Sequence, residues 1–440
     1  MKTKHIYIVL LLLFAGFTTL IIRYARPESK LELKMRSGEL AGTSEWLNTK
    51  SAIEGLINEI NNHPDNNKAK LQLALAYIQE SRISGEHAYY DKTALQLLDD
   101  VLKKEPANVD ALCSKATVLL SQHHFADAIP FAEQAMKLNP YNSGIYGIMT
   151  DAYVELGKYT DAIKMADKMV NVRPDLRSYS RVSYLREILG DYKGAIASMK
   201  LAVSAGYPGL EQTAWVRTCL GHLYEITGEL KEAEMQYKIV LSERSDYPFA
   251  FAGLGRLEKA KLNYPAAILY FEKAKKQIKE FSFDEELTEI YRISNQPLKA
   301  SQHAYETISL LTGLNDKNGT GHGHYADREL ALAYLDAYRY DLALTHALIE
   351  YNRRPDNIDV NETLAWVYYK RGEYTDADKY ITVAMKTGSQ NPKLLYEAGL
   401  IKMKSGEKEK GIALINQSLQ INPFVSPLLK WERKNYLTYK

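Results

Sequence analysis

The sequence predicts an all-α fold in which helical hairpins stack into a solenoid, because two features repeat along it. Small residues recur every 33 to 43 residues, and a proline follows several of them after twelve residues. A fixed period in this range is typical of stacked supersecondary units. The small residues are Ala94, Ala128, Ala162, Ala195, Ala233, Ala267, Ala300, Ala343, Ala377 and Gly411, and the prolines are Pro106, Pro140, Pro174, Pro355 and Pro423.

Each repeat carries the signals of a helix, a tight turn and a second helix. A large–small–x–x–Tyr stripe, as in residues 364–368, has helical spacing. In the turn Gly157-Lys-Tyr159, the glycine ends the first helix because it adopts positive φ readily. We expect Thr160 to cap the second helix through its hydroxyl group. The late proline then closes the unit, since it cannot continue a helix.

This pattern resembles the tetratricopeptide repeat (TPR), a helical hairpin of 34 residues with small residues at two crossings, a Tyr and a late Pro. The resemblance covers roughly residues 65–423 as about ten units. It implies a right-handed superhelical solenoid that works through an extended surface. One unit departs from the pattern, because Asn295-Gln-Pro297 forms its turn and no proline closes it.

The repeats and the flanking sequence predict six segments. Residues 1–5 form a basic N-terminal tail and residues 23–43 a linker, on either side of an apolar helix. An apolar stripe beside Ala52 indicates an N-terminal capping helix or half-repeat. In order, the segments are 1–5, the anchor or signal at 6–22, the linker at 23–43, the N-terminal cap at 44–64, the repeat array at 65–423 and a C-terminal capping helix at 424–440.

The apolar run at residues 6–22 predicts a single membrane span. Its seventeen residues are at the short end for a spanning helix and long for the core of a signal peptide. No small-x-small cleavage site follows, so we expect an uncleaved anchor, with a cleaved signal peptide as the alternative. The basic residues after the run favour a cytoplasmic body, but a short basic tail before an apolar core is typical of an export signal. We expect a single-pass membrane protein whose body lies on the exported side, envelope or periplasmic.

Composition and motifs indicate no enzyme. The net charge is +2 without a basic run, which argues against nucleic acid as a partner. The sequence lacks an HExxH, CxxC, Walker or GxSxG motif, so we expect no cofactor and no small-molecule substrate. One alternative remains in the long interval at residues 311–325, where His322 and His324 could take part in a metal-binding or enzymatic accessory site.

The resemblance to TPR proteins implies where a partner binds. In that family the first helix of each hairpin lines the concave groove, at positions eleven, eight and fifteen residues before the repeating alanine. Arg256, Lys259, Arg292 and Arg328 fall on such positions and would form a seat for an acidic peptide or a C-terminal carboxylate. The alternative is a solvated face of mixed charge. The candidate partner-binding residues are Tyr184, His222, Arg256, Lys259, Arg292, Arg328, Trp366 and Tyr369.

Taken together, these features predict a membrane-tethered TPR scaffold that binds a protein or an extended peptide through its concave groove. Its partners would be that protein or peptide and, through residues 6–22, the lipid bilayer. Two alternatives stay open: an exported assembly factor that uses its convex face, and an accessory protein that uses the 311–325 loop.

Overall fold

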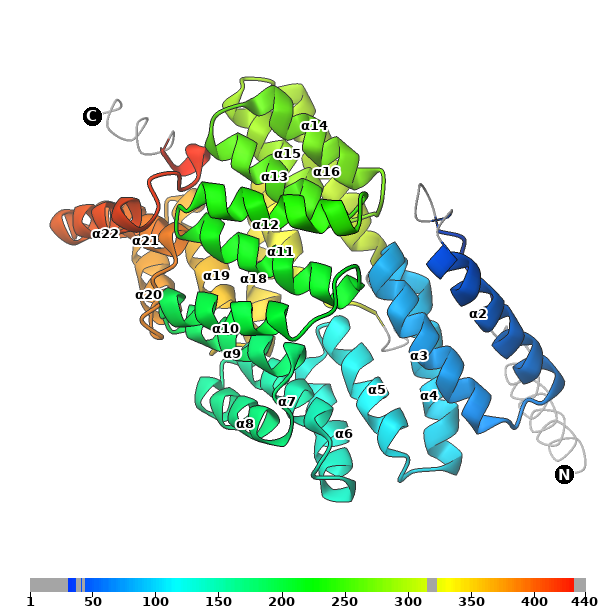
Figure 1. Ribbon diagram of the computed structural model, residues 1–440. Coiled ribbons are helices and arrows are strands. Elements are labelled where there is room, and N and C mark those ends of the chain that lie inside the picture. Colours follow the sequence, from blue (N-terminus) through cyan, green and yellow to red (C-terminus); the bar gives the residue numbers. More distant parts are fainter. Residues whose placement is uncertain (1–30, 37–40, 42–43, 315–322, 431–440) are drawn as a thin grey trace, which may run out of the picture.

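The computed structural model describes residues 31–36, 41, 44–314 and 323–430, and among these residues it contains helices and no strand (Figure 1). The prediction of an all-α fold is confirmed. The predicted apolar helix at residues 6–22 lies outside the described residues.

Ten hairpins follow one another, and α2 (Ser44–Asn62) packs against the first of them. The two helices of each hairpin contact each other more extensively than either contacts any other helix. The hairpins are α3 (Asn67–Ser84) with α4 (His87–Lys104), α5 (Val109–Ser121) with α6 (Phe125–Leu138), α7 (Ser143–Glu155) with α8 (Tyr159–Val172), α9 (Leu176–Ile188) with α10 (Tyr192–Ser204), α11 (Glu211–Ile226) with α12 (Leu230–Glu243), α13 (Pro248–Ala260) with α14 (Tyr264–Lys275), α15 (Phe281–Ile293) with α16 (Pro297–Leu314), α17 (Asp327–Asp336) with α18 (Tyr340–Arg353), α19 (Ile358–Arg371) with α20 (Tyr374–Ala384), and α21 (Pro392–Lys404) with α22 (Lys408–Ile421).

The repeating small residues lie where the helices of a hairpin cross. Ala94, Ala162 and Ala267 are fully buried. In the last hairpin the approach is closer still, since a Cβ atom on Gly411 would lie 2.5 Å from the carbonyl oxygen of Gly399. A larger side chain at these positions would force the helices apart, which explains why the sequence period shows in small residues.

Helix capping differs between α5 and α8. Asn108, two residues after the closing Pro106, accepts a hydrogen bond from the Ala111 amide at 3.0 Å and so caps α5. The second helix α8 begins at Tyr159, the aromatic residue of its turn. In α8 that start lies one residue before Thr160, and no side chain caps this helix, so the prediction that Thr160 is a cap is wrong.

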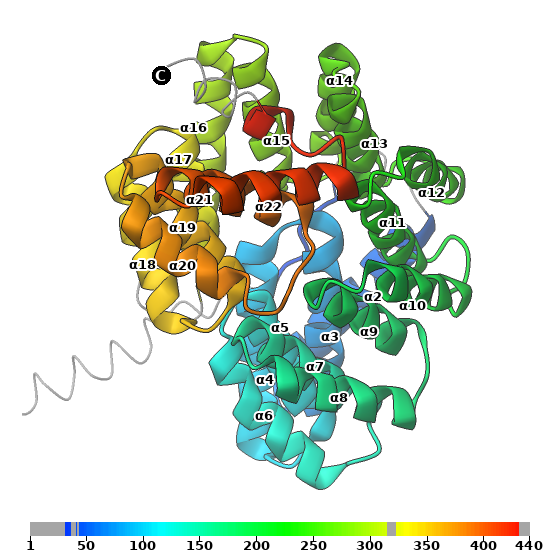
Figure 2. The same ribbon diagram turned by 90° about the vertical axis from the view of Figure 1, so that its left-hand side faces the viewer.

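The first helices of the hairpins form the inner side of the curve. Most contact the first helix of the next hairpin, as α5 contacts α7 and α17 contacts α19, and α15 reaches α17 through the hydrogen bond from Arg292 to Asp336. The described second helices make no comparable contacts with one another. Figure 2 shows the hairpins following one another around the molecule, from α7 and α8 through α11 to α16 and on to α19 and α20. Side chains on the inner side therefore come from the first helices.

Five hairpins complete one turn of the solenoid. The tight turn inside each of the first five hairpins contacts the loop that follows the hairpin five places later. We call α3–α12 the first layer and α13–α22 the second layer. The contacting pairs are Gly85 with Lys279, His123 with Tyr325, Gly157 with Asp356, Gly190 with Gly388, and Gly228 with Pro423.

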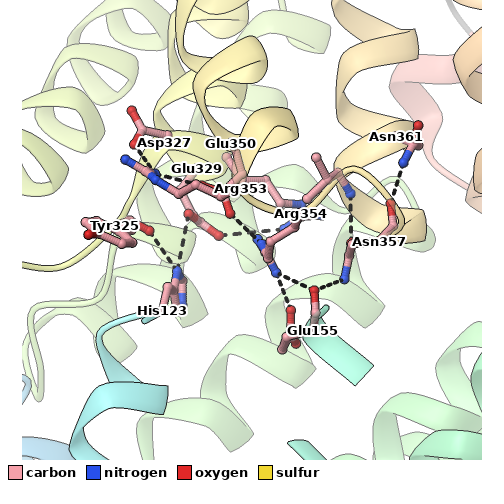
Figure 3. Close-up of polar contacts among 12 residues, drawn as sticks. His123, Glu155, Tyr325, Asp327, Glu329, Glu350, Arg353, Arg354, Asn357 and Asn361 are labelled. Atoms are coloured by element: carbon pink, nitrogen blue, oxygen red, sulfur yellow. Dashed lines mark hydrogen bonds and ion pairs between the residues drawn. The ribbon is translucent and has the colours of Figure 1, made fainter. Parts of the chain in front are cut away.

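Polar contacts join the two layers near the middle of this series of five contacting pairs (Figure 3). The guanidinium group of Arg354 donates to the Glu155 carboxylate at 2.5 Å, and the Asn357 amide donates to the Glu155 carbonyl oxygen at 3.0 Å. The Nδ1 atom of His123 lies 2.9 Å from the Tyr325 carbonyl oxygen. The layers are thus held by specific hydrogen bonds between residues about 200 positions apart in the sequence.

Glycine in the first-layer turns lets the second layer approach. Gly157 has a φ of +72°, and a Cβ atom there would lie 2.2 Å from the Asp356 carbonyl oxygen. At the equivalent turns of the second layer, Leu262 and Tyr338 adopt positive φ with large side chains that are 62% and 64% exposed. Side chains fit there because, in the part of the chain that the structure describes, no further layer covers those turns.

The predicted localisation as a single-pass membrane protein needs correction. Among residues 31–36, 41, 44–314 and 323–430, no helix combines the length and apolar character needed to cross a bilayer. The segment 6–22, on which the prediction depended, lies outside those residues. The membrane localisation, and with it the bilayer as a partner, is therefore not retained.

Candidate functional site on the inner helices

The eight predicted partner-binding residues lie on six consecutive first helices. We call the inward-directed side chains of these helices the inner surface. Tyr184 is on α9, His222 on α11, Arg256 and Lys259 on α13, Arg292 on α15, Arg328 on α17, and Trp366 and Tyr369 on α19. Because first helices of successive hairpins contact one another, these eight residues lie along one continuous surface.

Arg256 belongs to a compact polar cluster between α11 and α12. Its Nε atom donates to Glu225 at 2.8 Å, and the Tyr237 hydroxyl donates to the other oxygen of the same carboxylate at 2.8 Å. The His222 ring lies 3.7 Å from Glu225. Burial alone would raise the pKa of Glu225, but Arg256 and His222 lower it to about 2. Glu225 is therefore ionised, and it forms an ion pair with Arg256.

Lys259 bridges to the next hairpin. Its ammonium group donates to Glu286 at 2.5 Å and to Glu289 at 2.8 Å, both on α15. Burial alone would lower the pKa of Lys259, but the two carboxylates raise it above its ordinary value. Lys259 is thus a cation held between two anions.

Arg292 and Arg328 are also surrounded by acidic groups. Arg292 donates to a carboxylate oxygen of Asp336 at 2.8 Å and to the carbonyl oxygen of the same residue at 2.7 Å. The nearest carboxylate oxygen to Arg328 belongs to Glu329, at 3.7 Å. Burial would lower the pKa of Arg328, yet carboxylates led by Asp359 raise it. Each of the four predicted cations is therefore matched by acidic neighbours in the protein itself.

The inner surface also carries acidic side chains that the prediction missed. Burial raises the pKa of Glu285 well above its ordinary value, and Asp336 and Glu329 act in the same direction. Burial likewise raises the pKa of Glu187 and of Asp359. Glu187 and Glu285 lie eight and fifteen residues before a repeating alanine, so the same positional rule could have found them.

Besides burial, acidic groups of both layers raise the pKa of Tyr184. Tyr184 on α9 is 40% exposed, but burial still raises the pKa of its hydroxyl well above the ordinary value, with Asp359 and Glu155 next in effect. Asp359 belongs to α19 in the second layer, whereas Glu155 belongs to α7 in the first. The Tyr184 hydroxyl thus lies near carboxylates from both layers.

The aromatic residues of the prediction lie at the C-terminal end of the inner surface. The rings of Trp366 and Tyr369 stack with centroids 4.7 Å apart and planes 9° from parallel. Both pack against an apolar cluster that includes Tyr396, Leu400 and Met403 on α21. They therefore form an aromatic and apolar wall beside the charged part of the site.

Two clusters that contain histidine are relevant to the metal-binding alternative. Asp284, His303 and Glu306 gather within ligand distance of one another, but the Lys275 ammonium group contacts both carboxylates and occupies the position of a cation. His324 lies against the ring of His123, with centroids 4.3 Å apart, where the two layers meet. Residues 315–322, including His322, lie outside the described residues.

Comparisons with known proteins place the chain among helical-repeat proteins. Residues 119–187 match the family model described as "Tetratricopeptide repeat". This match supports the interpretation of the chain as a TPR repeat protein. The chain is also similar to a protein of Triticum aestivum named Hsp70-Hsp90 organizing protein, at 20% identity over 136 residues, which is 30% of this chain and 23% of that protein. The chain therefore spans less than a quarter of the length of this relative.

Solved structures of repeat proteins are similar as well. A thermophilic TPR protein of Thermus thermophilus, TTC0263, matches 46% of this chain and 99% of its own length at 22% identity and a TM-score of 0.38. The Cut9-Hcn1 hetero-tetramer of the APC/C matches 81% of this chain and 64% of that chain at 16% identity and a TM-score of 0.46. TM-scores this low carry no argument about function.

Proposed function

We propose that this chain is a scaffold that binds an extended segment of a partner protein along its inner surface. Repeat solenoids present long surfaces of this kind to their partners. The match to a tetratricopeptide repeat over residues 119–187 supports a protein-binding role. So do the half-exposed polar side chains of the inner helices, because a purely structural interior would be largely apolar.

The main support for this proposal is the imbalance of charge on the inner surface, which also indicates the sign of the partner's charge. The four predicted cations have acidic neighbours, so an incoming carboxylate would have to displace one of these. By contrast, no cation of the described residues forms an ion pair with three inner carboxylates whose pKa values are raised: Glu187, Glu285 and Asp359. Arg328 acts on Glu285 and Asp359 only as a more distant charge, which does not offset the effect of burial on their pKa values. A lysine or arginine side chain placed beside them would relieve the cost of burying unpaired carboxylates. We therefore propose that the partner segment is basic, and not the acidic peptide that the four predicted cations would seat.

A binding experiment with a double variant that removes two carboxylates tests this proposal. We expect immobilised peptides of equal length and varied net charge to retain the full chain in proportion to their Lys and Arg content. The Glu285→Gln/Asp359→Asn variant should bind the retained peptides about 10- to 100-fold more weakly, because a hydrogen bond to a charged group contributes about 1.5–3 kcal/mol and 1.4 kcal/mol is a factor of ten. Retention should also fall as salt rises.

A matched variant controls for the change in net charge. Glu133→Gln/Asp167→Asn removes the same charge from exposed positions on the second helices α6 and α8. This protein should bind as the wild type does. Equal retention by both double variants, or preferential retention by acidic peptides, would rule out a basic partner on the inner surface. The amide substitutions should not unfold the chain, since they mimic protonated carboxyl groups whose pKa values are already raised.

A further inference from the structure

The chain turns back onto the inner surface after α22. In Figure 2 the segment that follows α22 (red) runs beside α15. The Asn422 amide donates to the Glu225 carbonyl oxygen on α11 at 3.1 Å, and the Ser426 hydroxyl donates to the Glu289 carboxylate on α15 at 3.0 Å. We call residues 422–430 the C-terminal segment. It contacts helices that lie three and five hairpins before its own end of the solenoid.

Apolar side chains anchor the same segment on the aromatic wall. Val425 and Leu429 are only 5% and 4% exposed. They pack in the cluster formed by Tyr396, Leu400 and Met403, against which Trp366 and Tyr369 also pack. The spacing of four residues brings Val425 and Leu429 to the same side of the segment, as in one turn of helix. Residues 427–430 are helical.

The polar contacts of the C-terminal segment go to the residues that hold the predicted site together. Glu225 is the partner of Arg256, and Glu289 is a partner of Lys259. By the five-hairpin register, a cap on the last hairpin would also meet the turn that follows α11, but it would not need to reach α15. This segment covers the aromatic wall, bonds the backbone of α11 at Glu225, and reaches Glu289, one of the two carboxylates that hold Lys259.

We propose that the C-terminal segment occupies the partner-binding site within the chain itself, and that a partner must displace it to bind. This inference rests on the proposed function and specifies the ligand further. The partner segment would present two apolar side chains four residues apart beside its basic residues. In the sequence, the chain after Leu429 has the same character, since Lys430, Arg433, Lys434 and Lys440 outnumber the single acidic residue, Glu432.

Displacement can be measured with the chain's own sequence as the probe. The full chain carrying Val425→Asp/Leu429→Asp should release the segment, because two buried apolar side chains become charged. A fluorescein-labelled peptide of residues 422–440 should then bind this variant at least tenfold more tightly than the wild type, as fluorescence anisotropy would show. The reason is that apparent affinity falls with the fraction of protein whose site is open.

Phe424→Asp is the matched control, because it places a charge in the same segment on a side chain that is 39% exposed. It should bind the probe as weakly as the wild type. A second variant, Asn422→Ala/Ser426→Ala, removes the two hydrogen bonds without adding charge and should give intermediate binding. Circular dichroism and thermal unfolding would establish that each variant is folded. Equal probe binding by the wild type and all variants would overturn the proposal and leave the segment as a structural cap.

The two proposals fail in different ways. If Glu285→Gln/Asp359→Asn weakens capture of basic peptides but release of the segment leaves probe binding unchanged, the basic partner site stands and intramolecular occupancy is wrong. If release of the segment opens the site to the probe while the charge variants have no effect, occupancy stands and the basic partner is wrong.

Discussion

Arg354→Ala is expected to lower the free energy of unfolding by about 3–5 kcal/mol, the cost of breaking a buried ion pair by removing one partner. The Arg354 side chain is 5% exposed and donates at 2.5 Å both to Glu350, within the second layer, and to Glu155, in the first layer (Figure 3). Its guanidinium group also lies 4.8 Å from the centre of the Phe125 ring. Without it, Glu350 is left as a buried carboxylate with one fewer cation and the layers lose their central contact.

Urea unfolding of the full chain, followed by circular dichroism, measures this loss. Arg371→Ala is the control, because Arg371 pairs with Asp341 and Glu373 at the surface, where an ion pair contributes about 0–1 kcal/mol. A loss below about 1 kcal/mol for Arg354→Ala would contradict the account of how the layers are joined.

Gly157→Ala should destabilise the protein more than Gly372→Ala does. Both glycines occupy the turn of a hairpin, with φ values of +72° and +82°, so both substitutions incur the cost of about 1–2 kcal/mol for a left-handed residue. Only at Gly157 would the new Cβ atom meet another layer, since it would lie 2.2 Å from the Asp356 carbonyl oxygen. At Gly372 the nearest atom is 4.0 Å away.

The difference between the two glycine variants therefore isolates the contact between layers. Overpacking typically adds about 1–3 kcal/mol, so we expect Gly157→Ala to exceed Gly372→Ala by that amount in urea unfolding. Equal losses would mean that the layers do not touch at this turn in solution.

The hairpins could be predicted from the sequence because their determinants are local. Ala162 is small because two helices cross there, and Gly157 ends a helix within the same unit. The stacking of layers could not be predicted in this way. It depends on the rotation from each hairpin to the next, summed over five hairpins, and no single unit records that sum. Thus Gly157 has a second role, towards Asp356, that its local pattern does not reveal.

In the candidate site, too, the local features could be predicted and the contacts between hairpins could not. The positional rule of the repeat placed Arg256 and Arg292 on the inner helices, where the structure has them. It did not predict their ionic partners. Asp336 lies on the next first helix, 44 residues after Arg292, and its pairing depends on how two hairpins face each other. The charge that a partner meets depends on such pairings. The sequence therefore offered either an acidic ligand or a solvated face of mixed charge, whereas we propose a basic ligand from the arrangement of charges.

Photo-crosslinking tests the central claim, that a basic partner segment binds the inner surface, most directly. A basic peptide retained by the full chain would carry a benzophenone group, and mass spectrometry would locate its cross-links after irradiation. We predict cross-links on the first helices α9, α13, α15, α17 and α19, at residues such as Tyr184. Cross-links confined to the second helices, for example at the exposed Met235 on α12, would contradict the claim and assign binding to the convex face.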